Sequence, residues 1–253
     1  MWGDEMKKHF IQNIFAVIKI RHFTVIVCLL FTVIYSFSVF YILSSSIIST
    51  AGSANSLPSV IVDAGHGGED GGAVAADGTN EKDYNLDIAL RLDQILKMNG
   101  YNVIMTRTDD IMTCDDGLPT LRARKISDIH NRFRIITENP NALFVSIHQN
   151  KYSDPLQHGT QVFYSGNNEL SKALAESIQS AVVSKFQQDN KRAVKKSGSE
   201  IYLLYNARSP AILVECGFIS NYDDLNKLKT DEYKTQMSMM IAEGIINFDR
   251  KGD

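Results

Sequence analysis

Hydrophobic positions follow two different patterns over most of the chain. Short apolar runs such as 59–64 and 142–150 predict strands, and the unbroken start of the second run indicates burial on both faces of a sheet. Other segments place apolar residues three or four positions apart, as at Ile88, Leu92 and Leu96, which is the period of an amphipathic helix. The alternation of the two patterns predicts a three-layer α/β domain with a mostly parallel central sheet.

The individual elements follow from the same patterns. Strands are predicted at 59–64, 101–107, 142–150, 159–165, 200–205 and 210–218. One helix is predicted to start after a cap at Asn80 and to stop at Gly100. Three more helices are expected at 120–137, 168–187 and 231–249.

The N-terminal part of the chain has a different pattern. Residues 23–43 contain no charged side chain, and a helix of this length covers the roughly 30 Å hydrocarbon core of a membrane. Four basic residues precede this segment, and no Lys or Arg follows it until Lys82. Because positive charge stays inside, residues 1–22 are predicted to be a cytoplasmic basic leader and the rest of the chain to be extracytoplasmic.

The fate of this apolar segment has two readings. Its length favours an uncleaved transmembrane anchor, while small residues around Ala51 and Ala54 fit a cleaved signal segment. Residues 44–58 are rich in Ser, Ala and Gly and are predicted to be a flexible linker. A single folded domain is then expected over 59–253.

Composition narrows the class of partner. The formal net charge is −3, whereas a nucleic-acid-binding protein needs a basic face, so no nucleic-acid partner is expected. The chain has three cysteines, one of them in the apolar segment. The other two, Cys114 and Cys216, are expected to be free thiols.

Polar residues end three of the predicted strands. His66 follows the first, His148 lies near the end of the third, and Glu215 lies within the last, while Glu81 begins the first long helix after a glycine-rich loop. Sites in such sheets form at the carboxyl ends of the strands, so these side chains are expected to converge. A carboxylate as buried as Glu215 costs several kcal/mol unless it is paired or has a chemical task.

Two histidines and one carboxylate form the ligand set of a catalytic zinc that keeps a position open for water. Zinc lowers the pKa of such a water, and a nearby glutamate can accept its proton. The ligands would come from distant segments, so their spacing alone carries little specificity.

Four blocks of sequence resemble one enzyme family. They are DAGHGGEDGGA at 63–73, EKDYNL at 81–86, SIHQN at 146–150 and PAILVECGFISN at 210–221. In this order they resemble the zinc-dependent N-acetylmuramoyl-L-alanine amidases, the amidase-3 family of cell-wall hydrolases. The resemblance implies Zn²⁺ on His66, Glu81 and His148, with Glu215 as the catalytic residue, on a twisted, mostly parallel sheet flanked by helices. Residues 59–253 would then be the catalytic domain.

The resemblance also implies a reaction. The expected activity is hydrolysis of the amide between N-acetylmuramic acid and L-alanine in peptidoglycan. One catalytic domain behind one N-terminal membrane segment is similar to the CwlD-type amidases, which remove stem peptides from spore cortex so that muramic lactam can form. A domain without targeting modules also suggests an accessory activating protein. The alternatives are a zinc peptidase or deacetylase of the same polymer, and a membrane-tethered wall-binding protein without catalysis.

Several further residues carry weaker hypotheses. Asp63 is read as a partner of a ligand histidine or as a strand-end cap. Arg107 is read as an anchor for an acidic group of the stem peptide or as part of a structural ion pair. Asn150 is expected to line the cleft or to sit in a turn. His130 is expected to be solvated, and His158 is a minor candidate for substrate contact.

Overall fold

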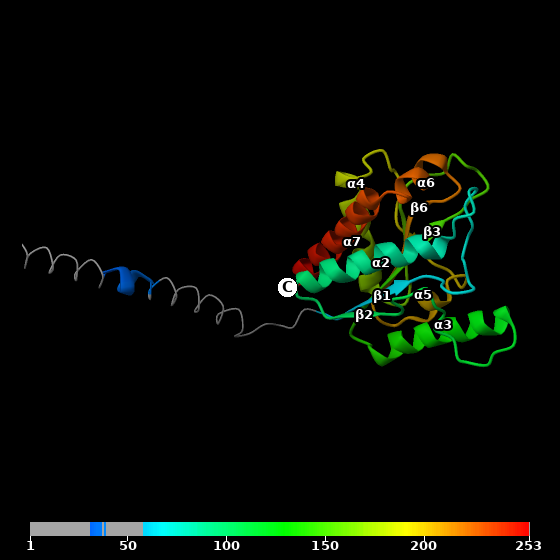
Figure 1. Ribbon diagram of the computed structural model, residues 1–253, viewed down its shortest axis with the longest axis horizontal. Coiled ribbons are helices and arrows are strands. Elements are labelled where there is room, and N and C mark those ends of the chain that lie inside the picture. Colours follow the sequence, from blue (N-terminus) through cyan, green and yellow to red (C-terminus); the bar gives the residue numbers. More distant parts are fainter. Residues whose placement is uncertain (1–30, 37, 39–57, 253) are drawn as a thin grey trace, which may run out of the picture. The chain divides into compact units, whose positions relative to one another are not determined.

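The computed structural model describes residues 31–36, 38 and 58–252 (Figure 1). The chain divides into two compact units, Met1–Ser56 and Leu57–Asp253. In the first unit, residues 31–36 and 38 are helical. The predicted leader, most of the predicted membrane segment and nearly all of the predicted linker lie outside the described residues. Among the residues that are described, no helix has the length and apolar character needed to cross a membrane.

The second unit is built on a mixed sheet of six strands in the order β2-β1-β3-β6-β4-β5. The strands are β1 (Val60–Ala64), β2 (Val103–Met105), β3 (Leu143–Asn150), β4 (Gln161–Tyr164), β5 (Lys195–Lys196) and β6 (Ala211–Phe218). The first four strands in this order are parallel, as predicted. Strand β4 is antiparallel to β6, and β5 is parallel to β4. The short connection 151–160 leaves no room for a crossover helix, so β4 runs back.

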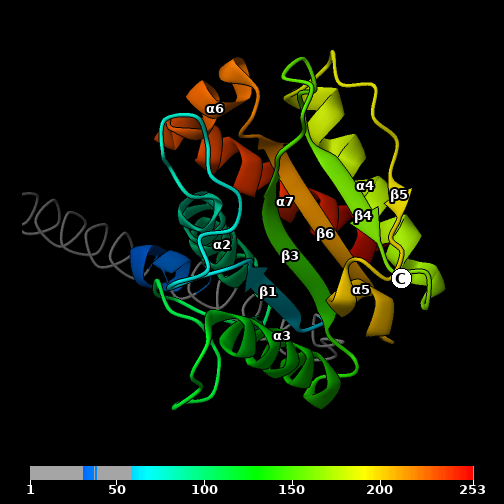
Figure 2. The same cartoon turned by 90° about the vertical axis from the view of Figure 1, so that its right-hand side faces the viewer.

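Helices cover both faces of the sheet (Figure 2). On one face lie α2 (Glu81–Met98), α4 (Glu169–Lys185) and α7 (Asp231–Gly252), with the short α6 (Tyr222–Leu228) beside α7. On the other face lie α3 (Leu121–Glu138) and α5 (Tyr202–Asn206). The predicted three layers are therefore present.

Strand alternation divides the core into two clusters. Val62, Ile147 and Val214 pack with α2, α4 and α7, whereas Phe144 and Leu213 pack with α3 and α5. Successive side chains of a strand point to opposite faces, so a strand covered on both sides is apolar throughout. This is why β1, β3 and β6 begin as unbroken apolar runs.

The strand predicted at 200–205 is wrong, because this segment forms helix α5. Leu203 and Leu204 are adjacent and both buried in the same cluster. A strand would send these two side chains to opposite faces, whereas a helical turn brings both to one side. Asn80 precedes α2 as predicted, but its side chain makes no capping hydrogen bond.

The two cysteines of the folded unit are as expected. Cys114 and Cys216 are both free. Cys216 is buried in the cluster that faces α2, α4 and α7, on the opposite side of β6 from Leu213. Burial raises the pKa of its thiol, so Cys216 is a core residue and not a nucleophile.

Candidate active site

His66 lies in the glycine-rich loop that follows β1. Among the described residues it is the only non-glycine with a positive φ, 61°, and such left-handed conformations cluster at functional sites. Gly67 and Asp70 exchange two backbone hydrogen bonds of 2.9 and 3.0 Å that close the loop. The Nδ1 atom of His66 lies 2.8 Å from Oδ2 of Asp70. This contact leaves Nε2 of His66 free to face Glu81.

Two glycines of the loop make room for the imidazoles. A Cβ atom on Gly65 would come within 2.2 Å of Nε2 of His148. A Cβ atom on Gly72 would lie 2.6 Å from the His66 ring and 2.7 Å from Oε2 of Glu81, and the φ of Gly72 is +69°. The space that a side chain would need at these two positions is therefore occupied by the imidazoles and the carboxylate of the site.

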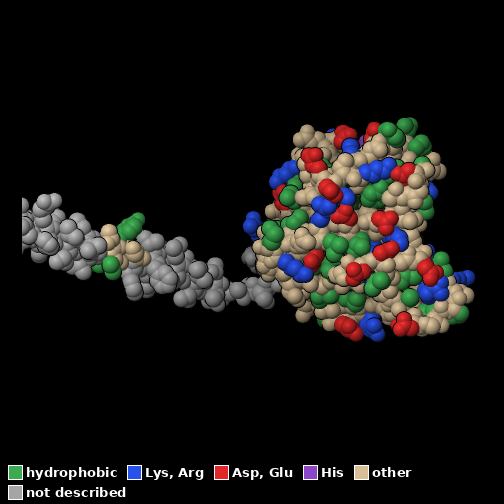
Figure 3. All heavy atoms as spheres, viewed as in Figure 1, with side chains coloured by type: hydrophobic (Ala, Val, Ile, Leu, Met, Phe, Trp, Pro, Cys, Tyr) green, Lys and Arg blue, Asp and Glu red, His purple; other side chains and the backbone are tan. Residues whose placement is uncertain are grey.

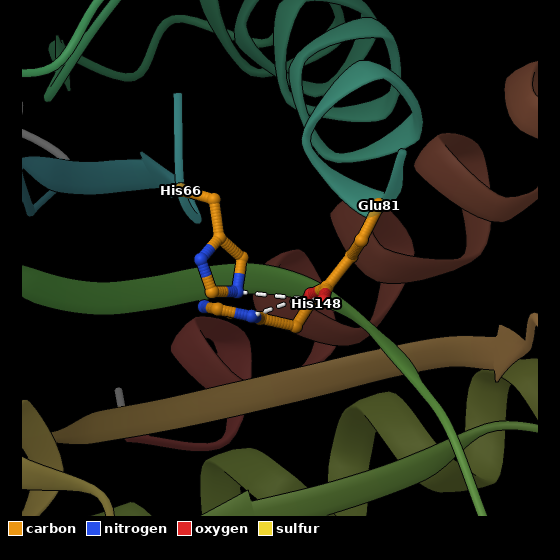
Figure 4. Close-up of side chains that lie close together, drawn as sticks. All are labelled: His66, Glu81 and His148. Carbon is orange, nitrogen blue, oxygen red and sulfur yellow. Dashed lines mark hydrogen bonds and ion pairs between the residues drawn. The ribbon is translucent and has the colours of Figure 1, made fainter. Parts of the chain in front are cut away.

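The side chains of His66, Glu81 and His148 meet at the carboxyl edge of the sheet (Figure 4). Nε2 of His66 is 3.4 Å from Oε2 of Glu81, and Nδ1 of His148 is 2.8 Å from Oε1 of the same carboxylate. The two rings stand edge to face with centroids 4.9 Å apart. One nitrogen or oxygen from each residue lies within 4.8 Å of the others. The sequence predicted that these three residues would converge, and the structure brings them together.

This donor set fits a zinc ion. Two ligands bound at about 2.1 Å around a tetrahedral centre lie roughly 3.4 Å apart, which is the separation of His66 and Glu81. Two imidazoles and one carboxylate are also ligands that zinc prefers, and three protein ligands leave a position for substrate or water. The three residues are therefore placed so that together they could hold a divalent metal.

Glu81 is held in place by donors from three segments. Oε2 accepts from the backbone N–H of Ala73, while Oε1 accepts from the N–H of Gln149 and from Nδ2 of Asn85. Asn85 also donates to the carbonyl of Gly65 and so ties α2 to the loop of His66. Burial favours the protonated acid, but the hydrogen bonds to His148 and His66 outweigh this and hold the pKa of Glu81 below its usual range.

The charge of His66 is set by its two carboxylate neighbours. Burial alone would lower its pKa, but hydrogen bonds to Asp70 and Glu81 overcome this and raise the pKa to about 9. A metal ion that takes Nε2 must therefore displace a proton. Asp70, which bonds His66 and forms an ion pair with Lys125 on α3, orients the ring. The sequence alone assigned Asp70 no role, although it lies in the same loop four residues after His66.

Glu215 lies beside this cluster. In the register of β3 and β6 it is the direct partner of His148, so the two side chains leave the same face of the sheet. Its Oε2 is buried and has no hydrogen-bond partner among the described residues. Burial, together with the negative charge of Glu81, raises the pKa of Glu215 to about 8. A carboxyl group with a pKa near neutrality suits both the uptake and the return of a proton.

Asp63 does not serve a histidine. Its carboxylate accepts hydrogen bonds from Arg132, Thr106 and Ser146, so the prediction of a histidine partner is wrong. Arg132, on α3, is buried, and its guanidinium also donates to the backbone carbonyl of His66 at 2.7 Å. This arginine, which the sequence did not single out, connects α3 to the loop of the site.

The remaining candidates lie outside the cluster. Arg107 is buried and donates to backbone carbonyls, including those of Ala64 and Gly65, so its role is structural. It forms no ion pair among the described residues. Asn150 lines a pocket next to the site. His130 is exposed and its ring contacts Tyr202, and His158 is exposed near Asp189.

Comparison with known proteins agrees with this geometry. The profile of the Amidase_3 family, described as N-acetylmuramoyl-L-alanine amidase, matches residues 60–247. The chain belongs to this amidase family. It is therefore an enzyme whose family acts on peptidoglycan, and the matched segment contains the whole cluster described above.

Similar amidases are found in several bacteria. A germination-specific N-acetylmuramoyl-L-alanine amidase of Bacillus subtilis (strain 168) is 33% identical over 195 residues, which cover 77% of this chain and 81% of that protein. The CwlD amidase from Clostridioides difficile, solved in complex with the GerS lipoprotein, has a TM-score of 0.74 and 35% identity over 78% of this chain and all of that one. The amidase AmiC2 of Nostoc punctiforme has a TM-score of 0.63 and 30% identity.

Proposed function

We propose that this amidase cleaves the bond between N-acetylmuramic acid and L-alanine with a zinc ion held by His66, Glu81 and His148. The observation that supports the proposal most directly is the convergence of three ligand atoms within 4.8 Å at the strand ends. Glu215 lies beside them, with its Oε2 buried and without a hydrogen-bond partner among the described residues, and supplies the acid–base group that such a hydrolysis needs.

The ion and the chain have separate tasks. When bound, zinc would polarise the scissile carbonyl and activate water for attack. Glu215 takes up the proton of the attacking water and returns it to the amine of L-alanine as the bond breaks. Asp70 keeps Nδ1 of His66 occupied, so that Nε2 points to the site.

Variants of the site separate binding from chemistry. Glu215→Gln should retain the zinc of the parent protein and lose almost all turnover, because the acid–base group is gone and the ligands are intact. His66→Ala and His148→Ala should lose both. Zinc content by mass spectrometry and release of peptides from purified peptidoglycan measure the two properties. Near-parental turnover of Glu215→Gln would show that this role is wrong.

The products decide between the enzymatic alternatives. An amidase frees intact stem peptides that begin with L-alanine, a peptidase shortens those peptides, and a deacetylase leaves them attached. Mass analysis of digested peptidoglycan separates the three outcomes, and a wall-binding protein without catalysis would release nothing. Membership of the amidase family favours the first outcome.

We further propose a role in spore cortex processing. Support comes from the germination-specific amidase of Bacillus subtilis and from the CwlD amidase, each more than 30% identical to this chain. The structure of CwlD with a lipoprotein also supports an accessory partner for this chain. Deletion of the gene in the source organism should leave cortex with intact stem peptides and without muramic lactam; cortex of parental composition would argue for a vegetative role.

The N-terminal segment completes the proposal. Its apolar residues 23–43 would tether the catalytic domain outside the cytoplasm or direct its secretion. Fractionation of cells with an antibody to the catalytic domain tests this. Tethered protein sediments with membranes at full length, secreted protein is shorter and free, and protein retained in the cytoplasm contradicts the proposal.

A further inference from the structure

The pocket that Asn150 lines lies next to the proposed acid–base residue. It has a volume of about 250 Å³ and is lined by Asn150, Gln161, Phe163, Arg192, Lys195 and Phe218, among others. Gln161 is the direct partner of Glu215 in the antiparallel pair of β4 and β6, so the two side chains leave the same face of the sheet. Asn150 ends β3, two residues after His148. The pocket therefore continues the site on the side of β4 and β5, which Figure 2 shows at one edge of the sheet.

Arg192 is held in this pocket by groups that carry no charge. Its Nε donates to the carbonyl of His158 at 2.9 Å, and its Nη2 donates to Oε1 of Gln157 at 2.7 Å. Its guanidinium carbon lies 4.6 Å from the ring centroid of Phe218. These contacts fix the orientation of the guanidinium before any ligand arrives.

The pocket carries an unbalanced positive charge. In the described part of the chain, no carboxylate forms an ion pair with Arg192 or with Lys195. At other places on the fold, including the face drawn in Figure 3, acidic and basic side chains are interspersed. An oriented, unpaired guanidinium is suited to bind a carboxylate.

Gln161 adds a second feature that points to a ligand. The side chain is 1% exposed, and its Nε2 donates to the carbonyl of Ala193 at 2.6 Å. Its Oε1 is buried without a hydrogen-bond partner among the described residues. A buried acceptor of this kind is costly, and an N–H group of a bound peptide would satisfy it.

We propose that this pocket, the Arg192 pocket, binds a carboxylate of the peptide that leaves, on the residue after L-alanine, and that Arg192 makes the enzyme prefer acidic peptides. The inference rests on the proposed function, because the position next to Glu215 places the leaving peptide there. It extends the proposed function by adding a preference for leaving peptides that are negatively charged.

Two substrates test the preference. They are muramoyl dipeptides that differ only in carrying a free carboxylate or a carboxamide on the second residue. The parent enzyme should prefer the acid in kcat/KM on the order of ten-fold, which corresponds to about 1.4 kcal/mol. Arg192→Gln should remove this preference by raising KM for the acid, with kcat and the reaction of the carboxamide little changed.

Matched variants control for damage to the fold. Lys191→Gln removes the neighbouring charge, which lies outside the lining of the pocket and donates to the carbonyl of Gln188, and should keep the parental preference. Arg192→Lys keeps the charge without the planar guanidinium and should retain part of the preference. An equal preference in the parent and in Arg192→Gln would overturn the proposal.

A binding measurement separates this proposal from the proposed function. Calorimetric titration with the two dipeptides that lack the muramoyl group needs no turnover. The dipeptide with the free carboxylate should bind the parent about ten-fold more tightly than it binds Arg192→Gln. Absent cleavage with carboxylate-dependent binding would contradict the proposed function alone. Normal cleavage, with equal affinities for the carboxylate and the carboxamide dipeptides, would contradict only the proposal for the Arg192 pocket.

Discussion

At the scale of single residues, the site requires that position 65 has no side chain. A Cβ atom there would contact His148, while the backbone of Gly65 needs no positive φ. Gly65→Ala should therefore displace His148 and weaken zinc binding at least ten-fold, which zinc competition with a chelating dye measures. Gly217→Ala is the control, because its nearest atoms would be at an ordinary 3.5 Å and its φ is not positive either. Equal zinc affinities in the two variants would contradict this reading.

The raised pKa of Glu215 predicts a pH-dependent stability. Burial and the charge of Glu81 raise the pKa of its carboxyl group from 4.5 to about 8, so the folded protein holds the proton more tightly than the unfolded chain. This contribution to stability is complete below about pH 4.5 and is lost as the pH rises through 8. Glu215→Gln removes this dependence.

The metal-free Glu215→Gln protein should thus gain stability over the parent as the pH increases from 4.5 to 8, by at most about 1.4 kcal/mol per pH unit. Urea unfolding with a chelator present, at pH 5 and pH 8.5, measures the difference. A difference that is the same at both pH values would mean that Glu215 is ionised in the folded protein.

The sequence predicted the site only as far as strand ends reveal it. His66, His148 and Glu215 became candidates because each follows or ends an apolar run, and Glu81 because it starts a helix, while their separate roles came from the family resemblance. Asp70 and Arg132 were missed because their roles depend on contacts with His66 that only the folded chain creates. Of the two alternatives for Asp63, the histidine partner was wrong for the same reason, since the carboxylate pairs with Arg132, which is 69 residues away.

At the scale of elements, helix α3 holds the loop of the site through Arg132. This buried guanidinium pairs with Asp63 and Asp128 and donates to the carbonyls of Ala64 and His66. Arg132→Met should lower the free energy of unfolding by about 3 to 5 kcal/mol, because two buried carboxylates lose their counter-charge. Urea denaturation measures this loss.

Arg134→Met on the same helix is the matched control. Arg134 is exposed, 3.9 Å from Glu138, and its loss should cost less than about 1 kcal/mol. If the two variants were equally stable, the buried pairs would not hold α3 on the loop.

The elements that the sequence predicted share a strong pattern. Long amphipathic helices and unbroken apolar strands were found near their observed bounds. The short elements were not: α6 and β5 were missed and α5 was predicted as a strand, because a few residues cannot show a period of 3.6 against one of 2. The antiparallel direction of β4 was missed because a strand's direction depends on the length of the connection before it and not on the residues of the strand.

At the scale of the whole molecule, the catalytic part is a compact unit of its own. The second unit spans Leu57–Asp253 and contains both core clusters and the entire site. A chain that begins at Leu57 should therefore fold with the melting temperature and zinc content that the catalytic unit has in the full-length protein. Calorimetry of both proteins in the same detergent measures this, and a melting temperature lower by more than about 5 °C would show that the first unit contributes to stability.

Helix α7 packs on both α2 and α4. Ser238 of α7 donates to the carbonyl of Ile88 in the helix that starts with Glu81, and Lys234 pairs with Asp87 there. Ser238 lies 150 residues after Ile88, so the helix that begins with Glu81 is supported only once two distant parts of the chain have packed together.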